Sequence, residues 1–230
     1  MRSRIILVAL LMFILLDVIE AGTISRMLCK QSSQYKCYTV KAHDSWESLF
    51  SNSGLRDLVM RINRINIPLY RGQQIAIPVN QYYSDLLDHS PLPRQIDPPH
   101  RKLIYVSINP AVLAWGAYNS AGNLVAWGPA VGGRGWCPDI NRGCHTRTGN
   151  FTIYSKQGAG CVSTKFPVPR GGAPMPYCMF FNGGFALHGS YQVPGYNASH
   201  GCVRLFVPDA KWLNQEFVGG ERNVAVVIDD

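Results

Sequence analysis

Two histidines and one cysteine that could do chemistry lie close together near the end of the chain. The stretch begins with His188-Gly189-Ser190 and, after a spacer, ends with Ser199-His200-Gly201-Cys202-Val203-Arg204. A thiol of ordinary pKa, about 8.5, is mostly protonated at neutral pH and needs a nearby imidazole to become a thiolate. These residue types therefore indicate a cysteine nucleophile activated by a histidine base.

Two other interpretations of the same stretch stay open on the residues alone. His188, His200 and Cys202 could supply three ligands to zinc, although the sequence has no second ligand cluster of the usual spacing. Alternatively, Cys202 is a small buried residue or a disulfide partner, and the histidines are hydrogen-bonding groups at the surface.

The seven cysteines bear on this choice, because an odd count leaves one without a partner in an exported protein. Six of them form three couples that are close in sequence, and pairing by proximity is one of many possible connectivities. The couples are Cys29 with Cys37, Cys137 with Cys144, and Cys161 with Cys178. This pairing leaves Cys202 as the free thiol.

The first 21 residues have the pattern of a secretory signal peptide. Arg2 and Arg4 form a basic start, residues 5–16 are apolar, and Ile19 and Ala21 fit a signal-peptidase site. An apolar run of this length spans about 18 Å as a helix, which is too short to cross a bilayer comfortably. We therefore expect secretion across the inner membrane into the periplasm or cell wall, without stable membrane insertion after cleavage. An uncleaved N-terminal anchor is the alternative.

The composition is that of a folded, basic protein. The chain has 230 residues, of which 47% are hydrophobic and 16% charged, and its net charge is +8. That balance excludes an intrinsically disordered chain. The basic residues are scattered, and no basic stripe alternates with aromatic residues, which argues against a nucleic-acid partner. A basic secreted protein is instead attracted to an anionic partner such as a cell wall.

The elements that must position these residues form a small module, a linker and a larger domain. After an N-terminal segment at 22–37, residues 38–79 predict a strand, two helices and a strand, because apolar residues at helical spacing lie between two β-rich runs. Residues 80–100 are proline-rich and predict a linker. Residues 101–230 predict a mainly β (α+β) domain, with strands at 103–108, 112–118 and 124–131, a helix at 208–217 and a final strand at 223–228.

The stretch from His188 to Arg204 is similar to the active-site signature of the L,D-transpeptidase (YkuD) family. That signature has His-Gly, a spacer, and then Ser/Thr-His-Gly-Cys followed by a hydrophobic residue and Arg or Asn. Two further segments agree with the family, namely Thr146-Arg147-Thr148-Gly149-Asn150-Phe151 and Met175-Pro176-Tyr177. The resemblance covers residues 101–230 and implies a β-sandwich-like catalytic domain.

The resemblance implies catalytic roles for four residues. Cys202 would be the nucleophile, and His188 would be the base that makes its thiolate. The backbone carbonyl of Gly189 would orient that imidazole, a task that a carboxylate usually performs in catalytic triads. The N–H groups of Gly201 and Cys202 would form an oxyanion hole.

Four more residues would have supporting roles. Ser199 and His200 would shape the loop around the nucleophile. Arg204 would support that loop or bind a substrate carboxylate, and Tyr177 would line the substrate or oxyanion pocket or pack into the core. The family's chemistry needs no metal ion and no organic cofactor.

The module at 38–79 resembles a LysM domain. The matching runs, in the family's order, are Tyr38-Thr39-Val40, Asp44-Ser45, Asn63 to Asn66, Arg71-Gly72-Gln73 and Ile75-Ala76-Ile77-Pro78. His43 stands where the family usually has glycine, and histidine is among the more tolerated residues if this turn needs a positive φ. The resemblance implies binding of glycan that contains N-acetylglucosamine. The alternative is a degenerate module that serves as a spacer.

Together the two resemblances imply an exported bacterial enzyme of peptidoglycan. Cys202 would attack the third residue of a stem peptide, release D-Ala and transfer the acyl group to an amine of another stem peptide or of an envelope protein. Water as the acceptor would make the enzyme an L,D-carboxypeptidase. A catalytically inactive peptidoglycan-binding envelope protein is the alternative from a different class. The family also implies acylation of the thiol by carbapenems.

Overall fold

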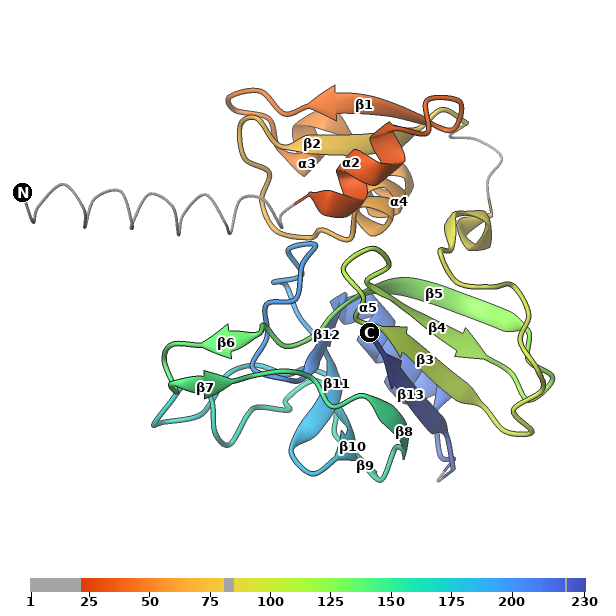
Figure 1. Ribbon diagram of the computed structural model, residues 1–230, viewed down its shortest axis with the longest axis vertical. Helices are drawn as coiled ribbons and strands as arrows, with labels where there is room; N and C mark the ends of the chain where they lie inside the picture. The colour runs from red at the N-terminus through yellow and green to blue at the C-terminus, as the bar shows by residue number, and fades with distance from the viewer. Residues whose placement is uncertain (1–21, 81–84, 222) are drawn as a thin grey trace, which may run out of the picture.

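The structure is a computed structural model that describes residues 22–80, 85–221 and 223–230, so the predicted signal peptide lies outside the described residues. A small N-terminal unit and a larger C-terminal unit lie against one another (Figure 1). No helix in the described ranges is both long enough and apolar enough to span a membrane. The small unit contains α2 (Thr23–Cys29), β1 (Tyr35–Thr39), α3 (Trp46–Leu49), α4 (Ser53–Asn63) and β2 (Gln74–Pro78).

The remaining elements belong to the connecting segment and the larger unit. They are η1 (Leu86–His89), β3 (Leu103–Ser107), β4 (Ala114–Tyr118), β5 (Leu124–Val131), β6 (Trp136–Cys137), β7 (Arg142–Gly143), β8 (Gly149–Thr152), β9 (Ser155–Lys156), β10 (Met179–Asn182), β11 (Phe185–Gly189), β12 (Val203–Leu205), α5 (Val207–Trp212), η2 (Leu213–Phe217) and β13 (Ala225–Asp229).

The N-terminal unit has the predicted order of strand, helix, helix and strand. β1 and β2 pair antiparallel, and the two helices between them bury an apolar core against the pair. The core residues are Val40, Trp46, Phe50, Val59, Ile65 and Ile75. The unit also contains a helix that the sequence pattern did not predict, α2, which packs against β2. The Cys29–Cys37 disulfide joins α2 to β1.

Local hydrogen bonds explain where these helices begin and end. The Ser45 hydroxyl accepts from the Ser48 N–H at the start of α3, and the Asn52 side chain accepts from the Leu55 N–H at the start of α4. Arg64 ends α4 in the left-handed conformation. His43 has a φ of 71°, so the turn does need the positive φ for which glycine would be the usual residue.

The C-terminal unit is built on one nine-stranded sheet in the order β8-β13-β3-β4-β5-β12-β11-β10-β9. β13 pairs parallel with β3, and β11 pairs parallel with β12, while the other neighbours are antiparallel. The sheet curls, and the helical segment α5–η2 lies against it (Figure 1). This architecture confirms the predicted mainly β fold class.

The main core lies between the curled sheet and the helical segment. Val207–Trp212 begins as an α-helix with proline in its first turn and continues as a π-helical turn over Leu213–Phe217, so the helix predicted at 208–217 is confirmed with a different C-terminal half. The core combines Ala210, Leu213 and Phe217 with strand residues such as Ile104, Trp115, Leu187, Val203 and Val226. Burial of these apolar side chains is what holds β11 and β12 at fixed positions.

The proline-rich segment before β3 packs against the outer face of the sheet. The Trp127 indole donates to the carbonyl of Leu86 at 2.6 Å, and the Tyr118 hydroxyl donates to the carbonyl of Pro93 at 2.8 Å. Leu92 is buried in the same apolar cluster as both aromatic rings. The segment predicted as a linker is therefore fastened to the larger unit over much of its described length.

All three predicted disulfides are confirmed, and Cys202 is the free cysteine. Proximity in sequence identified the partners because the two cysteines of each couple lie in the same folded segment. The Cys161–Cys178 disulfide closes the long loop between β9 and β10. It lies in one buried cluster with Met175 and Ala186, which places it beside β11.

Candidate active site

Two neighbouring parallel strands bring the predicted base and nucleophile together. In the pairing of β11 with β12, Leu187 lies opposite Val203, and His188 lies opposite Arg204. Cys202 directly precedes Val203 and therefore comes beside Ala186, with which it shares a buried cluster. Side chains two residues apart on a strand point to the same face, so the thiol lies on the same face as the His188 imidazole.

The His188 imidazole is held in one orientation and one protonation state. The side chain is 6% exposed, and its Nδ1 lies 2.9 Å from the carbonyl oxygen of Gly189. Because a carbonyl can only accept, Nδ1 carries the proton and Nε2 keeps its lone pair. Burial lowers the pKa of His188 to about 4, and the charge of Arg204 lowers it too, against the Gly189 hydrogen bond. The His188 imidazole is thus neutral at physiological pH.

The Cys202 thiol is neutral as well. Its Sγ lies 3.7 Å from the carbonyl oxygen of Gly184, and the residue is half-buried. Burial raises the pKa of Cys202 above its ordinary value, although the Ala186 N–H and the charge of Arg204 offset part of this effect. The resting pair is therefore thiol and imidazole, with no standing thiolate.

The loop before the nucleophile is held by two hydroxyl groups. The Ser199 hydroxyl donates to the Cys202 carbonyl and accepts from the Gly201 N–H at 3.0 Å. The Thr146 hydroxyl donates to the Gly201 carbonyl and accepts from the Gly133 N–H, each at 2.8 Å. Both hydroxyls are almost inaccessible to solvent. The loop is therefore fixed from inside the larger unit.

Gly201 has a steric role that the sequence motif did not specify. Its φ is 117°, and a Cβ atom there would lie 2.5 Å from a ring carbon of Phe185. Only glycine fits this position. Its N–H, predicted to donate to an oxyanion together with the Cys202 N–H, donates to the Ser199 hydroxyl in this conformation. The oxyanion role of both N–H groups stays a prediction.

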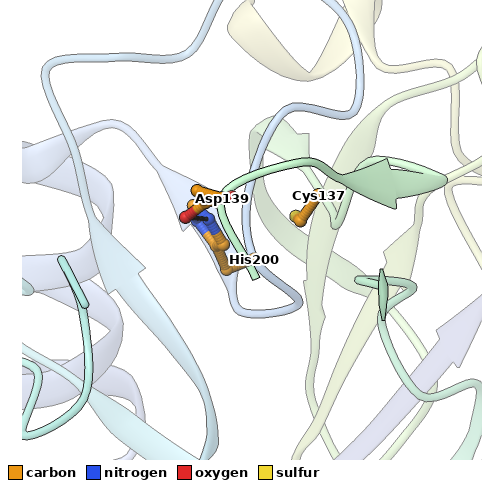
Figure 2. A group of neighbouring side chains, drawn as sticks. All are labelled: Cys137, Asp139 and His200. Atoms are coloured by element: carbon orange, nitrogen blue, oxygen red, sulfur yellow. Dashed lines mark hydrogen bonds and ion pairs between the residues drawn. The ribbon is translucent and has the colours of Figure 1, made fainter. Parts of the chain in front are cut away.

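His200 lies in a cluster with Asp139 and Phe166. Its Nε2 lies 2.7 Å from a carboxylate oxygen of Asp139, as Figure 2 shows, and its ring stacks on Phe166 at 4.4 Å between centroids. Cys137 lies beside them, but its sulfur is bonded to Cys144 and cannot ligate a metal as a thiolate. Among the described residues, no candidate metal-ligand group combines His200 with His188 and Cys202. That His200 shapes the loop stays a prediction.

Two arginines bring positive charge to the nucleophile's surroundings. Arg204 donates to the carbonyl of Gln192 at 3.3 Å, and Arg134 donates to the carbonyl of Ala198 at 3.0 Å. Burial and the charge of Arg134 both lower the pKa of Arg204. Within the described ranges, no carboxylate forms an ion pair with either guanidinium. Their charge is thus available to an anionic ligand.

Tyr177 lies at the edge of this region with its ring packed against the main core. Its φ is 58°, an uncommon value for a residue other than glycine, and its N–H donates to the Gly158 carbonyl at 3.0 Å. The neighbouring Cys178 disulfide restrains the same segment. The structure thus places Tyr177 in the core contact that was one of its two predicted uses.

The long-range contacts of several contributing residues carried no sequence signal. Thr146 was part of a recognised motif, but its bond to Gly201 spans 55 residues. Asp139 and Arg134 approach the loop only because β5 and the segment after it lie beside β12. No local pattern predicts such pairs, since periodicity informs only about neighbours on the same element.

The C-terminal unit is similar to known proteins. Residues 101–226 match the family model of YkuD, the L,D-transpeptidase catalytic domain. Among solved structures, the L,D-transpeptidase from Xylanimonas cellulosilytica is similar over 70% of this chain and 73% of its own, with 25% identity and a TM-score of 0.51. An L,D-transpeptidase from Stackebrandtia nassauensis is similar over 60% of this chain but only 59% of its own, with 22% identity and a TM-score of 0.45. A search of curated proteins gives no match.

Proposed function

The chain belongs to the L,D-transpeptidase (YkuD) family, whose members are acyltransferases of cell-wall synthesis, and we propose that Cys202 is the nucleophile that peptidoglycan stem peptides acylate. The observation that carries the proposal is the placement of a free thiol and an oriented, neutral imidazole on one face of two adjacent parallel strands. A base with its lone pair at Nε2 is what a protonated thiol requires.

The first half-reaction forms a thioester. As Sγ of Cys202 bonds to the carbonyl carbon of the third stem residue, a diamino acid such as meso-diaminopimelate, Nε2 of His188 takes the thiol proton. The negative charge moves to the carbonyl oxygen, where the Cys202 N–H is the candidate donor. Collapse of this intermediate breaks the peptide bond to D-Ala. The leaving amine takes the proton back from His188, which restores the neutral imidazole.

The second half-reaction transfers the acyl group. His188 removes a proton from an incoming amine as its nitrogen attacks the thioester carbonyl, and the thiolate leaves and regains that proton. The product is a new amide bond to a neighbouring stem peptide or to an envelope protein that becomes anchored. If water attacks the thioester instead of an amine, the same steps hydrolyse it, and the enzyme acts as an L,D-carboxypeptidase. Carbapenems would acylate the same sulfur.

The surroundings of the thiol support an anionic peptide substrate. Arg204 and Arg134 have no carboxylate partner among the described ion pairs, and a guanidinium recognises a carboxylate through paired hydrogen bonds. The C-terminal carboxylate of the stem peptide and the side-chain carboxylate of a diamino acid are the groups that would meet them. Ser199 and His200 would keep the loop in place while substrate binds.

We also propose the setting in which the enzyme works. Three disulfides among the described residues are typical of a protein that folds outside the reducing cytosol, which supports export by the signal-like residues 1–21 to the periplasm or cell wall. The N-terminal unit would serve as a LysM module for glycan strands. Its surface has a pocket lined by residues that include Val40, Lys41 and Arg71.

The proposal is tested with the mature chain, residues 22–230, and a disaccharide-tetrapeptide substrate analysed by mass spectrometry. We expect loss of D-Ala and appearance of a cross-linked dimer, and we expect Cys202→Ala to lower the rate by at least about a thousandfold. Ser51→Ala, an exposed substitution in the N-terminal unit, is the control that should change nothing.

Three outcomes separate the alternatives. Loss of D-Ala with no dimer, even when an amine acceptor is supplied, would favour the carboxypeptidase. Cys202-independent release would contradict the nucleophile assignment. No reaction by folded enzyme with a reduced thiol, together with retention on insoluble peptidoglycan, would favour the inactive binding protein.

A further inference from the structure

The turn after α4 of the N-terminal unit is bonded to the segment that follows the catalytic histidine. The Asn66 side chain donates from Nδ2 to the Ser190 carbonyl and accepts at Oδ1 from the Val193 N–H, both at 2.8 Å. The Asn66 backbone N–H donates to the Val193 carbonyl at 3.0 Å. Ile65 forms a β-bridge with Pro194. Three hydrogen bonds from one residue thus join two units of the chain.

The contact is closely packed as well as hydrogen-bonded. Ile65 is 1% exposed and Val193 is fully buried. Gly195 has a φ of 84°, and a Cβ atom there would lie 3.0 Å from Cγ1 of Ile65. A side chain at position 195 would therefore press on the N-terminal unit. Because apolar side chains pack around this contact, water cannot easily enter and replace the hydrogen bonds of Asn66.

The bonded segment lies between the base and the nucleophile in the chain. Ser190 directly follows the Gly189 carbonyl that orients His188, and its own N–H is bonded to the Leu205 carbonyl at 2.8 Å. The Gln192 carbonyl accepts from Arg204. At the far end, Asn197 is fixed by bonds to Gly132 and Ile108. The ends of the segment are thus held by the larger unit, whereas the backbone of Val193 is held by Asn66.

A second bond fixes the same helix of the N-terminal unit to the element that follows the nucleophile strand. The Arg61 guanidinium forms a two-pronged ion pair with Asp209 on α5, at 2.6 and 2.7 Å, and both side chains are buried. The turn that carries Asn66 therefore cannot shift easily relative to β12. Asn66 is held at a defined place before it contacts Val193.

We propose that Asn66 is a positioning residue for the active site, and that the docked N-terminal unit holds residues 190–195 where they orient His188 and Arg204. The unit would then contribute to each catalytic cycle in addition to any glycan binding. The activity part of this inference rests on the proposed function, whereas the structural coupling does not. Displacement of residues 190–195 is expected to lower kcat more than it raises KM, because it moves the reacting groups and removes no substrate contact.

The test compares Asn66→Ala and Asn66→Asp with Asn52→Ala. Asn52 lies at the opposite end of α4 and bonds only to the local Leu55 N–H, so it is a matched loss of an asparagine side chain without a contact to the larger unit. We expect Asn66→Ala to lower kcat by about tenfold to a hundredfold with a KM changed by less than about twofold. Asn66→Asp keeps the acceptor for Val193 and loses the donor to Ser190, and its defect should be smaller. Asn52→Ala should leave both constants unchanged.

Hydrogen exchange supplies a readout that does not depend on the reaction. The Val193 amide should exchange about tenfold faster in Asn66→Ala than in wild type, as expected from the loss of its hydrogen bond, and should be unaffected in Asn52→Ala. Unchanged kcat in folded Asn66→Ala, or equal effects of Asn66→Ala and Asn52→Ala, would overturn the inference. If wild type releases no D-Ala, the proposed function fails, and the exchange of Val193 still decides whether Asn66 holds the segment. If Asn66→Ala does not fold, Asn66→Ser, whose shorter side chain also loses the bonds to Ser190 and Val193, takes its place in both measurements.

Discussion

Burial sets the protonation state of the two reacting groups at the scale of single residues. His188 is enclosed by the core and bonded to one carbonyl, so its proton is confined to Nδ1. Cys202 is neutral for the same reason, because burial disfavours the thiolate as it disfavours the imidazolium.

The neutral state of His188 predicts a loss of stability in acid. Its pKa is about 4 in the folded protein, whereas an unfolded chain has a histidine pKa of about 6.5. Between these values the unfolded chain binds a proton that the folded chain does not, so stability falls as the pH falls through this range. At pH 4.5 this effect makes the free energy of unfolding about 2 to 3 kcal/mol lower than at pH 7.

Urea unfolding at pH 7.0 and 4.5 measures this effect, with His188→Gln as the comparison. The variant cannot take up the proton, so the difference between its stabilities at the two pH values should be smaller than that of wild type. His145→Gln, which changes an exposed histidine, is the control that should retain the full pH dependence. Equal pH dependence of wild type and His188→Gln would contradict the assignment of a neutral, buried base.

Parallel pairing of β11 with β12 assembles the site at the scale of elements. The register sets His188 opposite Arg204 and brings Cys202 to the same face, while Ser199 and Thr146 fix the loop between these strands from behind. α5 follows β12 directly and carries Asp209 to the boundary between the two units. One short helix therefore links the nucleophile strand to the N-terminal unit.

Because the ion pair between Arg61 and Asp209 is buried, removing the charge of Asp209 should destabilise the protein strongly. Asp209→Asn should lower the free energy of unfolding by about 3 to 5 kcal/mol, because it leaves a buried guanidinium without its main counter-charge. Trp115, which also donates to Asp209, would lose a charged acceptor. Chemical unfolding followed by tryptophan fluorescence measures the change.

The matched control is the other carboxylate that Arg61 contacts. Asp57 pairs with the same guanidinium at 2.6 Å, but its side chain is 49% exposed, so Asp57→Asn should cost less than about 1 kcal/mol. Replacing both buried partners by apolar residues, as in Arg61→Met with Asp209→Leu, should recover much of the loss. A cost for Asp209→Asn no greater than that for Asp57→Asn would show that the buried pair does not hold the units together.

The two units share a packed boundary at the scale of the whole molecule. Apolar residues of both meet in a shared cluster, in which Ile24, Leu28 and Met60 pack against Val131 and Phe206. Arg64 adds to this boundary, since its guanidinium donates to the Val112 carbonyl and lies 4.8 Å over the ring of Trp127. The boundary is thus packed, charged and hydrogen-bonded at once.

This boundary predicts a single cooperative unfolding transition for the mature chain. Calorimetry of residues 22–230 with intact disulfides should show one peak whose calorimetric and van't Hoff enthalpies agree. Asp209→Asn should broaden or divide that peak, because the N-terminal unit then loses its buried attachment. Two separate transitions in wild type would contradict the coupling of the units and would weaken the role given to Asn66.

Local patterns in the sequence were sufficient to predict the strand, helix, helix and strand order of the N-terminal unit, the first and last strands of the larger domain, and its helix. The strand predicted at 124–131 and the helical spacing within 53–63 correspond to β5 and α4, since local composition and periodicity reflect the conformation of a single element. Proximity of cysteines predicted three disulfides, and the residues around Cys202 predicted its family. Each of these inferences depends on residues that are close together in the chain.

Only the tertiary structure decided how the site is held and charged. The bond of the Gly201 N–H to Ser199, the pairing of His200 with Asp139 and the contact of Asn66 with Val193 all depend on how distant segments meet. So do the protonation states of His188 and Cys202, because desolvation by the surrounding core sets them and no neighbour in sequence does. The physical reason is that spacing along the chain determines residue type and local conformation, whereas enclosure and partner choice arise only when the sheet curls and the two units pack together.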